Sequence, residues 1–83
     1  MRRFSLNVFP DGLDGPYRKK NLVKAAFIEE PFVVETQEGD MEISPNTVDD
    51  WEDGYYILYP DDGSKPYTNS PSFFEANYVL SGS

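Results

Sequence analysis

The chain has 83 residues, with no cysteine and no histidine, and its 15 acidic and seven basic side chains give a formal net charge of −8. These absences exclude disulfides, thiolate or imidazole metal centres, and serine–histidine or cysteine–histidine catalysis. We therefore expect a single domain over residues 1–83 that is not an enzyme, needs no cofactor or metal, and lies in a reducing cytoplasm.

Charge is unevenly distributed along the chain. Residues 1–24 carry six bases and two acids, whereas residues 25–83 carry thirteen acids and one base. Between Glu35 and Asp62 there are ten acids and no base. Because phosphate contacts need a positive surface, direct binding to nucleic acid is disfavoured. No apolar run reaches the length of a signal core or a membrane span, so no membrane partner is expected.

The first predicted elements are strands. In "RFSLNVF", Phe4, Leu6 and Val8 alternate with polar residues, which is typical of a half-buried strand. "PDGLDGPY" then interrupts the pattern with two glycines and two prolines. The segment 22–28, "LVKAAFI", returns to an extended pattern and ends before Pro31. The intervening basic segment 18–20 predicts a solvated strand edge, with contact to phosphate or an acidic partner as the alternative.

Two hairpins are expected in the middle of the chain. "FVVETQ" and "MEIS" flank the turn "EGD", and "GYYILYP" and "KPYTNS" flank "DDGS". In residues 54–60, Tyr55, Ile57 and Tyr59 share one face while Tyr56 and Leu58 share the other. Both faces are apolar, which predicts a central strand covered on both sides.

The C-terminal segment predicts a short helix. Ser70 can cap it, Pro71 suits the first helical position, and Phe74 and Tyr78 are spaced i to i+4. About two turns of helix are unstable alone, so the helix must pack on the sheet. The expected fold is therefore α+β: a small curved antiparallel sheet of about five strands with two hairpins, and a short C-terminal helix packed on it.

Several short motifs resemble a group of small, uncharacterised bacteriophage and prophage proteins. That group shares a "YRKKP" opening, an "EGDM" turn, a "PGDW" or "PGDY" segment and a closing "P..FE..Y". The corresponding residues here span 17–78: Tyr17-Arg18-Lys19-Lys20, Glu38-Gly39-Asp40-Met41, Gly54-Tyr55-Tyr56-Ile57, Tyr67, Pro71, Phe74-Glu75 and Tyr78. Asn21 stands where the group has proline, and "NTVDDWED" is inserted before Gly54. The resemblance implies a viral context and no activity.

The acidic segment "VDDWEDGYYILYPDDG" fits two specific motifs poorly. Read as an EF-hand loop from Asp49, it places Trp51 at the third position and Pro60 at the twelfth, where calcium ligands are required. A glycosidase-type carboxylate pair would need a deep cleft, for which a domain of this size has little volume. Neither a metal site nor acid–base catalysis is therefore predicted.

A nucleic-acid mimic is the sharper hypothesis. Ten acids match the charge of about 17 Å of duplex DNA. Trp51, surrounded by acids, is either an exposed contact for a partner or a cap that folds back over the sheet. The predicted partner-binding residues are Glu38, Asp40, Glu42, Asp49, Asp50, Trp51, Glu52, Asp53, Asp61 and Asp62.

The sequence thus predicts a non-catalytic protein that binds the basic surface of a host protein and blocks its access to nucleic acid. An anti-CRISPR or anti-restriction inhibitor is one example of this class. The alternatives are a solvated acidic face that only aids solubility, and a structural or assembly module that forms a homodimer through sheet edges or the C-terminal helix.

Overall fold

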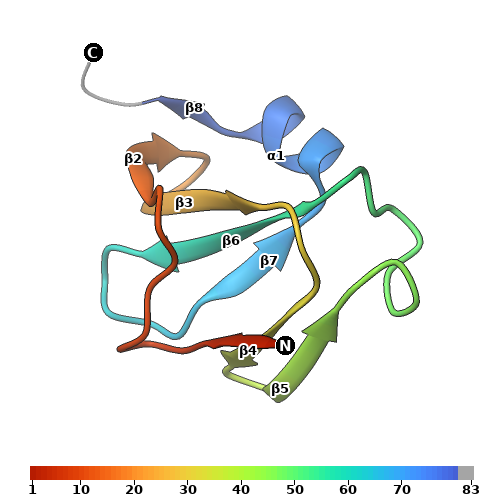
Figure 1. The fold of residues 1–83 in the computed structure, drawn as a ribbon. Coiled ribbons are helices and arrows are strands. Elements are labelled where there is room, and N and C mark those ends of the chain that lie inside the picture. Colours follow the sequence, from red (N-terminus) through yellow and green to blue (C-terminus); the bar gives the residue numbers. More distant parts are fainter. Residues whose placement is uncertain (81–83) are drawn as a thin grey trace.

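The structure is a computed structural model that describes residues 1–80, and it contains two β-sheets and one short helix (Figure 1). The helix α1 spans Pro71–Asn77. The strands are β1 (Arg2–Phe4), β2 (Asp14–Arg18), β3 (Leu22–Ile28), β4 (Phe32–Thr36), β5 (Gly39–Ile43), β6 (Tyr55–Pro60), β7 (Tyr67–Asn69) and β8 (Val79–Leu80). The predicted α+β class with a short C-terminal helix is confirmed.

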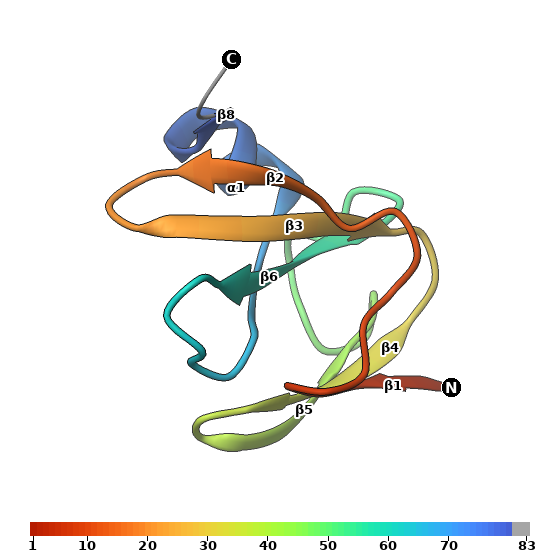
Figure 2. The same cartoon turned by 90° about the vertical axis from the view of Figure 1, so that its left-hand side faces the viewer.

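The strands divide between a larger and a smaller sheet. The larger has the order β7-β6-β3-β2-β8 and is antiparallel throughout. The smaller has the order β1-β4-β5, with β1 parallel to β4. Figure 2 shows the smaller sheet below the larger one, with β3 leading down into β4. The chain changes sheet at Glu29-Glu30-Pro31, where proline lacks the N–H needed to continue a ladder.

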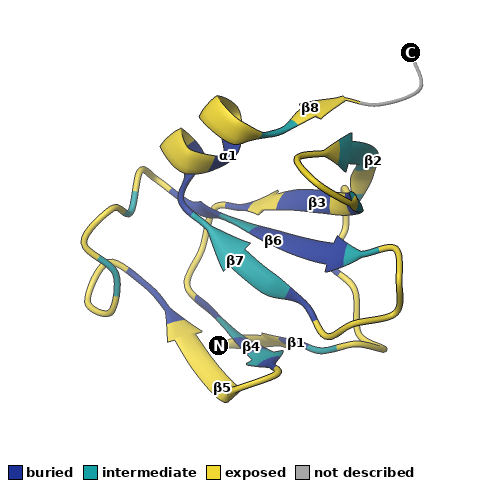
Figure 3. Cartoon of the chain, turned by 180° about the vertical axis from the view of Figure 1, so that it is seen from behind, coloured by how far each residue is buried: buried dark blue, intermediate teal, exposed yellow. Residues whose placement is uncertain are grey.

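Strand β6 is an interior strand of the larger sheet, between β7 and β3. It pairs with β3 over six residue pairs, from Val23↔Pro60 to Ile28↔Tyr55, and with β7 on its other side. One of its faces contributes Tyr55, Ile57 and Tyr59 to a core cluster shared with the smaller sheet. The other contributes Leu58 to a second cluster beneath the helix. The predicted central strand, covered on both sides, is confirmed (Figure 3).

Both predicted hairpins form. In the first, Thr36 pairs with Gly39, so the connecting residues are Gln37 and Glu38. The Thr36 hydroxyl donates to the Gly39 carbonyl (2.8 Å) and accepts from the Glu38 amide (3.1 Å). The second hairpin joins β6 to β7 through the turn around Gly63. The polar side chain of Thr36 thus fixes a turn that glycine alone suggested in the sequence.

The N-terminal strand is shorter than predicted. Phe4 is buried, with its ring edge-on to Phe32 at 5.7 Å, but Leu6 and Val8 are exposed. The backbones of Ser5 and Val8 exchange two hydrogen bonds of 3.2 Å, which close a tight turn. Because these local bonds satisfy the backbone, the alternating pattern does not continue as a strand, and the prediction for Leu6 and Val8 is wrong.

The helix forms as predicted. The Ser70 hydroxyl accepts from the Phe73 amide (3.1 Å), and Pro71 is the first helical residue. Phe74 is buried and stacks on Tyr56 at 4.0 Å and on Tyr78 at 5.0 Å. This aromatic stack docks the seven-residue helix on the sheet. Across residues 1–80, no helix has the length and apolar character needed to cross a bilayer.

We predict that Gly54→Ala strongly destabilises the fold. A Cβ atom at Gly54 would overlap Cζ of Phe27 and would lie 2.6 Å from the Ile28 carbonyl oxygen. Since the backbone of β3 cannot move without breaking its pairing with β6, we expect the free energy of unfolding to fall by about 2–4 kcal/mol. Urea unfolding followed by the fluorescence of the single tryptophan measures this change.

Gly63→Ala is the matched control for this prediction. Gly63 also has a positive φ (86°), but a Cβ atom there would meet nothing within 4 Å. Only the backbone strain applies, so a loss of about 1 kcal/mol is expected. If both variants lost the same free energy of unfolding, close contact with β3 would not be the reason that position 54 needs glycine.

Candidate functional site

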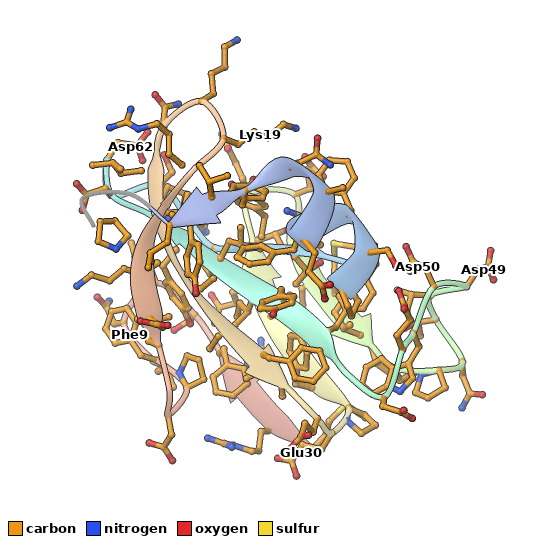
Figure 4. The ribbon with its side chains drawn as sticks, turned by 90° about the horizontal axis from the view of Figure 1, so that it is seen from above. Phe9, Lys19, Glu30, Asp49, Asp50 and Asp62 are labelled. Carbon is orange, nitrogen blue, oxygen red and sulfur yellow. The ribbon has the colours of Figure 1, made fainter. Side chains whose placement is uncertain are left out.

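The acidic loop, which we define as residues 49–53, lies between β5 and β6. Asp49, Asp50, Glu52 and Asp53 are all exposed. In Figure 4, Asp49 and Asp50 project from one end of the molecule. Within the described part of the chain, the ion pairs are Arg2–Glu30, Arg3–Glu35 and Arg3–Asp40, so no basic side chain pairs with this loop. The loop therefore presents four unpaired carboxylates.

Three side-chain contacts hold the acidic loop against the fold. Trp51 is half-buried, packs against the core cluster, and lies parallel to the Tyr55 ring, with centroids 6.3 Å apart. The Tyr55 hydroxyl donates to Asp50 (2.8 Å), and the Ser72 hydroxyl at the start of α1 donates to Glu52 (2.5 Å). Of the two alternatives predicted for Trp51, an exposed partner contact or a cap over the sheet, the structure shows the cap. Its packing anchors the loop.

The loop ends in a reversal of the backbone. Asp53 has φ 58°, a left-handed conformation that Asp and Asn adopt more readily than most residues. Gly54 follows it, buried against Phe27. This geometry turns the chain into β6 while the Asp53 side chain remains exposed.

The acids of the β4–β5 hairpin have a different environment. Asp40 accepts a hydrogen bond from the Arg3 guanidinium, which also lies 3.9 Å from Glu35. The bond to Asp40, and then its charge, raise the pKa of Arg3. Glu42 accepts from the Ser44 hydroxyl (3.1 Å). Although no base lies between residues 35 and 62 in the sequence, Glu35 and Asp40 thus have a basic neighbour in the structure.

The remaining predicted residues lie elsewhere again. Asp61 and Asp62 occupy the β6–β7 turn, where hydrogen bonds from Ser64 hold the pKa of the Asp62 carboxyl below its usual value. Figure 4 places Asp62 at the end of the molecule opposite Asp49 and Asp50. Glu38 lies in the turn of the first hairpin. The ten predicted residues thus fall into three separate groups. The acidic loop holds five of them, has no ion pair among the described residues, and is tied to the fold by Trp51, Tyr55 and Ser72.

A second site, absent from the sequence predictions, is a cavity of about 680 Å³ beside the edge strand β7. We call it the β7 groove. Three of the seven basic side chains line it: Lys19 and Lys20 from the β2–β3 turn, and Lys65 from the β6–β7 turn. Phe73 lines it from the helix, and its ring lies 4.7 Å from Nζ of Lys19. The groove thus combines cations with an aromatic wall.

Polar side chains of β7, and Tyr78 at the end of α1, also line the groove. The hydroxyls of Tyr67 and Tyr78 lie 2.9 Å apart, and burial, followed by this hydrogen bond, raises the pKa of Tyr67. Asn69 Nδ2 is buried and has no hydrogen-bond partner among residues 1–80. These residues meet only through the folding of segments distant in sequence. The basic segment 18–20 was their only signal in the sequence.

Neither site has the geometry of a metal centre. Among the residues that the structure describes, no three carboxylate side chains come together in a way that could hold an ion. Comparison with known proteins finds no matching family model, no matching curated protein and no matching solved structure. The resemblance to phage proteins therefore stays a prediction, and the two sites are interpreted from their own chemistry.

We predict that the protein loses stability between about pH 10 and pH 12. Burial, together with the bond to Asp50, raises the pKa of Tyr55 to about 12, and burial does the same for Tyr59. The folded state favours the neutral phenol. The contribution of each neutral tyrosine to the free energy of unfolding is therefore fully present below the unfolded pKa of about 10, and it is lost as the pH rises through 12. The loss is on the order of 2–3 kcal/mol for each tyrosine.

The double variant Tyr55→Phe/Tyr59→Phe tests this assignment. It loses the hydroxyl bonds to Asp50 and to the Val8 carbonyl, so it is less stable at pH 7 by about 1 kcal/mol for each bond. Above pH 10, however, its free energy of unfolding should fall less steeply than that of the wild type. Urea titrations at a series of pH values give both slopes, and identical slopes would contradict the assignment.

We predict that Asn69→Leu stabilises the protein. It removes the buried, unpaired amide and keeps a side chain of similar size, so the free energy of unfolding should rise by about 1 kcal/mol. Thr68→Val is the control, since it makes a similar exchange at the next residue of β7 without removing a buried unpaired donor. An equal gain in both variants, measured by urea unfolding, would assign the effect to hydrophobicity alone.

Proposed function

We propose that this chain is a non-catalytic binding protein whose acidic loop docks on a basic surface of a partner protein and keeps nucleic acid off that surface. One observation carries the proposal: four carboxylates lie within five residues, have no basic neighbour in the described structure, and are held in place by Trp51, Tyr55 and Ser72. Charged surfaces of this kind find and orient partners of opposite charge.

The fixed shape of the loop supports binding. A flexible loop would lose conformational freedom when it docks, and that loss weakens association. Here Trp51 packs into the core cluster and two hydrogen bonds tie Asp50 and Glu52 to the fold, so part of the ordering cost is met during folding. Asp49 and Asp53 have no such bond among the described residues and are therefore free to contact a partner.

The setting of this proposal comes from the resemblance of residues 17–78 to phage proteins. It points to a host protein that handles nucleic acid, such as a CRISPR effector or a restriction enzyme, as the partner. The departure from the phage motifs falls on the segment that contains the acidic loop. A loop that differs within a group of similar proteins is a common location for partner choice.

The alternative function is a structural module that assembles with copies of itself. Strand β8 favours it, because β8 is the outer strand of the larger sheet and its two side chains, Val79 and Leu80, are 66% and 51% exposed. An open edge with apolar side chains is a common place for strands of two chains to pair. Light scattering on the free protein distinguishes a monomer from such a dimer.

We predict that Asp49→Asn/Asp53→Asn weakens partner binding at least tenfold, or about 1.4 kcal/mol. These two carboxylates are chosen because Asp50 and Glu52 accept the bonds that hold the loop. Asn also tolerates the left-handed backbone at position 53. Tagged protein is incubated with host lysate at low and high salt, and the captured protein is then purified for affinity measurements and for competition with its nucleic acid.

Asp11→Asn/Glu29→Gln is the control, because it removes the same two charges from exposed positions outside the predicted surface. It should change the affinity less than twofold, and unchanged Trp51 fluorescence should show that the loop keeps its shape in both variants. Equal binding by the two variants would sink the proposal. So would a ternary complex in which the partner holds this chain and nucleic acid at the same time.

A further inference from the structure

The β7 groove is positively charged although the protein as a whole is acidic. Among its ionisable lining residues are Lys19, Lys20 and Lys65 against Glu38 and Asp62, a local charge of +1 on a chain of −8. In Figure 4, Asp62 lies at the left and Lys19 at the top of the molecule, whereas Asp49 and Asp50 project from its right. The groove and the acidic loop are therefore separate surfaces with opposite local charge.

Besides the carboxylates of Glu38 and Asp62, which are acceptors, the groove offers a set of hydrogen-bond donors. The three lysines offer ammonium hydrogens. The Tyr67 and Tyr78 hydroxyls share one hydrogen between them, which leaves a second hydrogen for another acceptor. Asn69, which also lines the groove, adds a buried amide nitrogen that has no partner among residues 1–80. A ligand that satisfies these groups must be rich in acceptors and negatively charged.

An aromatic surface lies next to these donors. Phe73 is 43% exposed although it belongs to a helix whose opposite face is buried, and Lys19 lies over its ring. Tyr78, which also lines the groove, is part of the stack with Phe74. A planar ring can pack on such side chains while a charged group beside it reaches the lysines.

We propose that the β7 groove binds a small anion that carries a planar ring, with the size and chemistry of a nucleoside monophosphate. The phosphate lies among Lys19, Lys20 and Lys65, and the ring packs on Phe73. The cavity of about 680 Å³ falls within the 300–1,000 Å³ range typical of small-ligand sites. A single phosphate needs only the local positive charge, whereas a long nucleic acid would meet the net charge of −8 as well.

The test is a titration of the full chain with AMP, followed by amide NMR shifts. We expect a dissociation constant below about 1 mM, with shifts concentrated at residues 19–21 and 65–69. Adenosine and inorganic phosphate are titrated in parallel, because each lacks one half of the ligand, and each should bind at least about tenfold more weakly. Saturation by inorganic phosphate at the same concentration as AMP would show an adventitious anion site only and would overturn the proposal.

Four variants test the location of the site. Lys19→Gln/Lys65→Gln should weaken AMP binding at least tenfold, whereas Lys19→Arg/Lys65→Arg should retain it, because arginine keeps the charge and the contact with Phe73. Asn69→Leu should weaken binding while it raises the unfolding midpoint, a combination that a purely structural residue would not give. Asp49→Asn/Asp53→Asn should leave AMP binding unchanged. A failure of the AMP proposal is therefore distinct from a failure of the proposal that the acidic loop binds a partner protein. No saturable shift with AMP, or equal binding by the Gln and Arg variants, would also overturn the proposal.

Discussion

The pairing of β6 with β3, and the burial of β6 on both faces, is the constraint on which the other elements depend. Tyr55, Ile57 and Tyr59 fill the core shared with the smaller sheet, and Leu58 fills the one beneath the helix. The two outer tyrosines also hold loops, since Tyr55 donates to Asp50 and Tyr59 donates to the Val8 carbonyl. A disturbance of β6 therefore reaches both cores and both loops.

This arrangement explains how a small chain with a net charge of −8 keeps a compact core. The buried residues are almost all apolar, and none of the acidic residues is buried. Arg3 offsets part of the charge beside β5, but nothing in the described structure offsets it at the acidic loop. Mutual repulsion there costs stability, and the packing of Trp51 compensates for it locally. Such a local cost is typical of a surface kept for binding.

Local patterns in the sequence were sufficient to predict the elements whose determinants are close together. Three predictions follow from residues within a few positions of one another. They are the strand with two apolar faces at residues 55–59, the start of the helix at Ser70-Pro71, and both hairpins. The features that were missed depend on distant residues. Arg3 meets Asp40 across 37 positions through the parallel pairing of β1 with β4, and the β7 groove combines the turn at Lys19 with β7 and Phe73. No periodicity along the chain encodes such contacts.

The two ends of β6 can act independently because of their separation. Six residues of strand span roughly 20 Å, whereas charges in physiological salt are screened over about 8 Å. The acidic loop precedes Tyr55 at one end, and the turn that carries Asp62 and Lys65 follows Pro60 at the other. The Lys65 end of the β7 groove is thus largely screened from the carboxylates of the loop, whereas Phe73, on another wall of the groove, follows Ser72, which donates to Glu52 of the loop. The net charge of the chain alone consequently describes neither surface, and each must be judged by the side chains within a few ångströms of it.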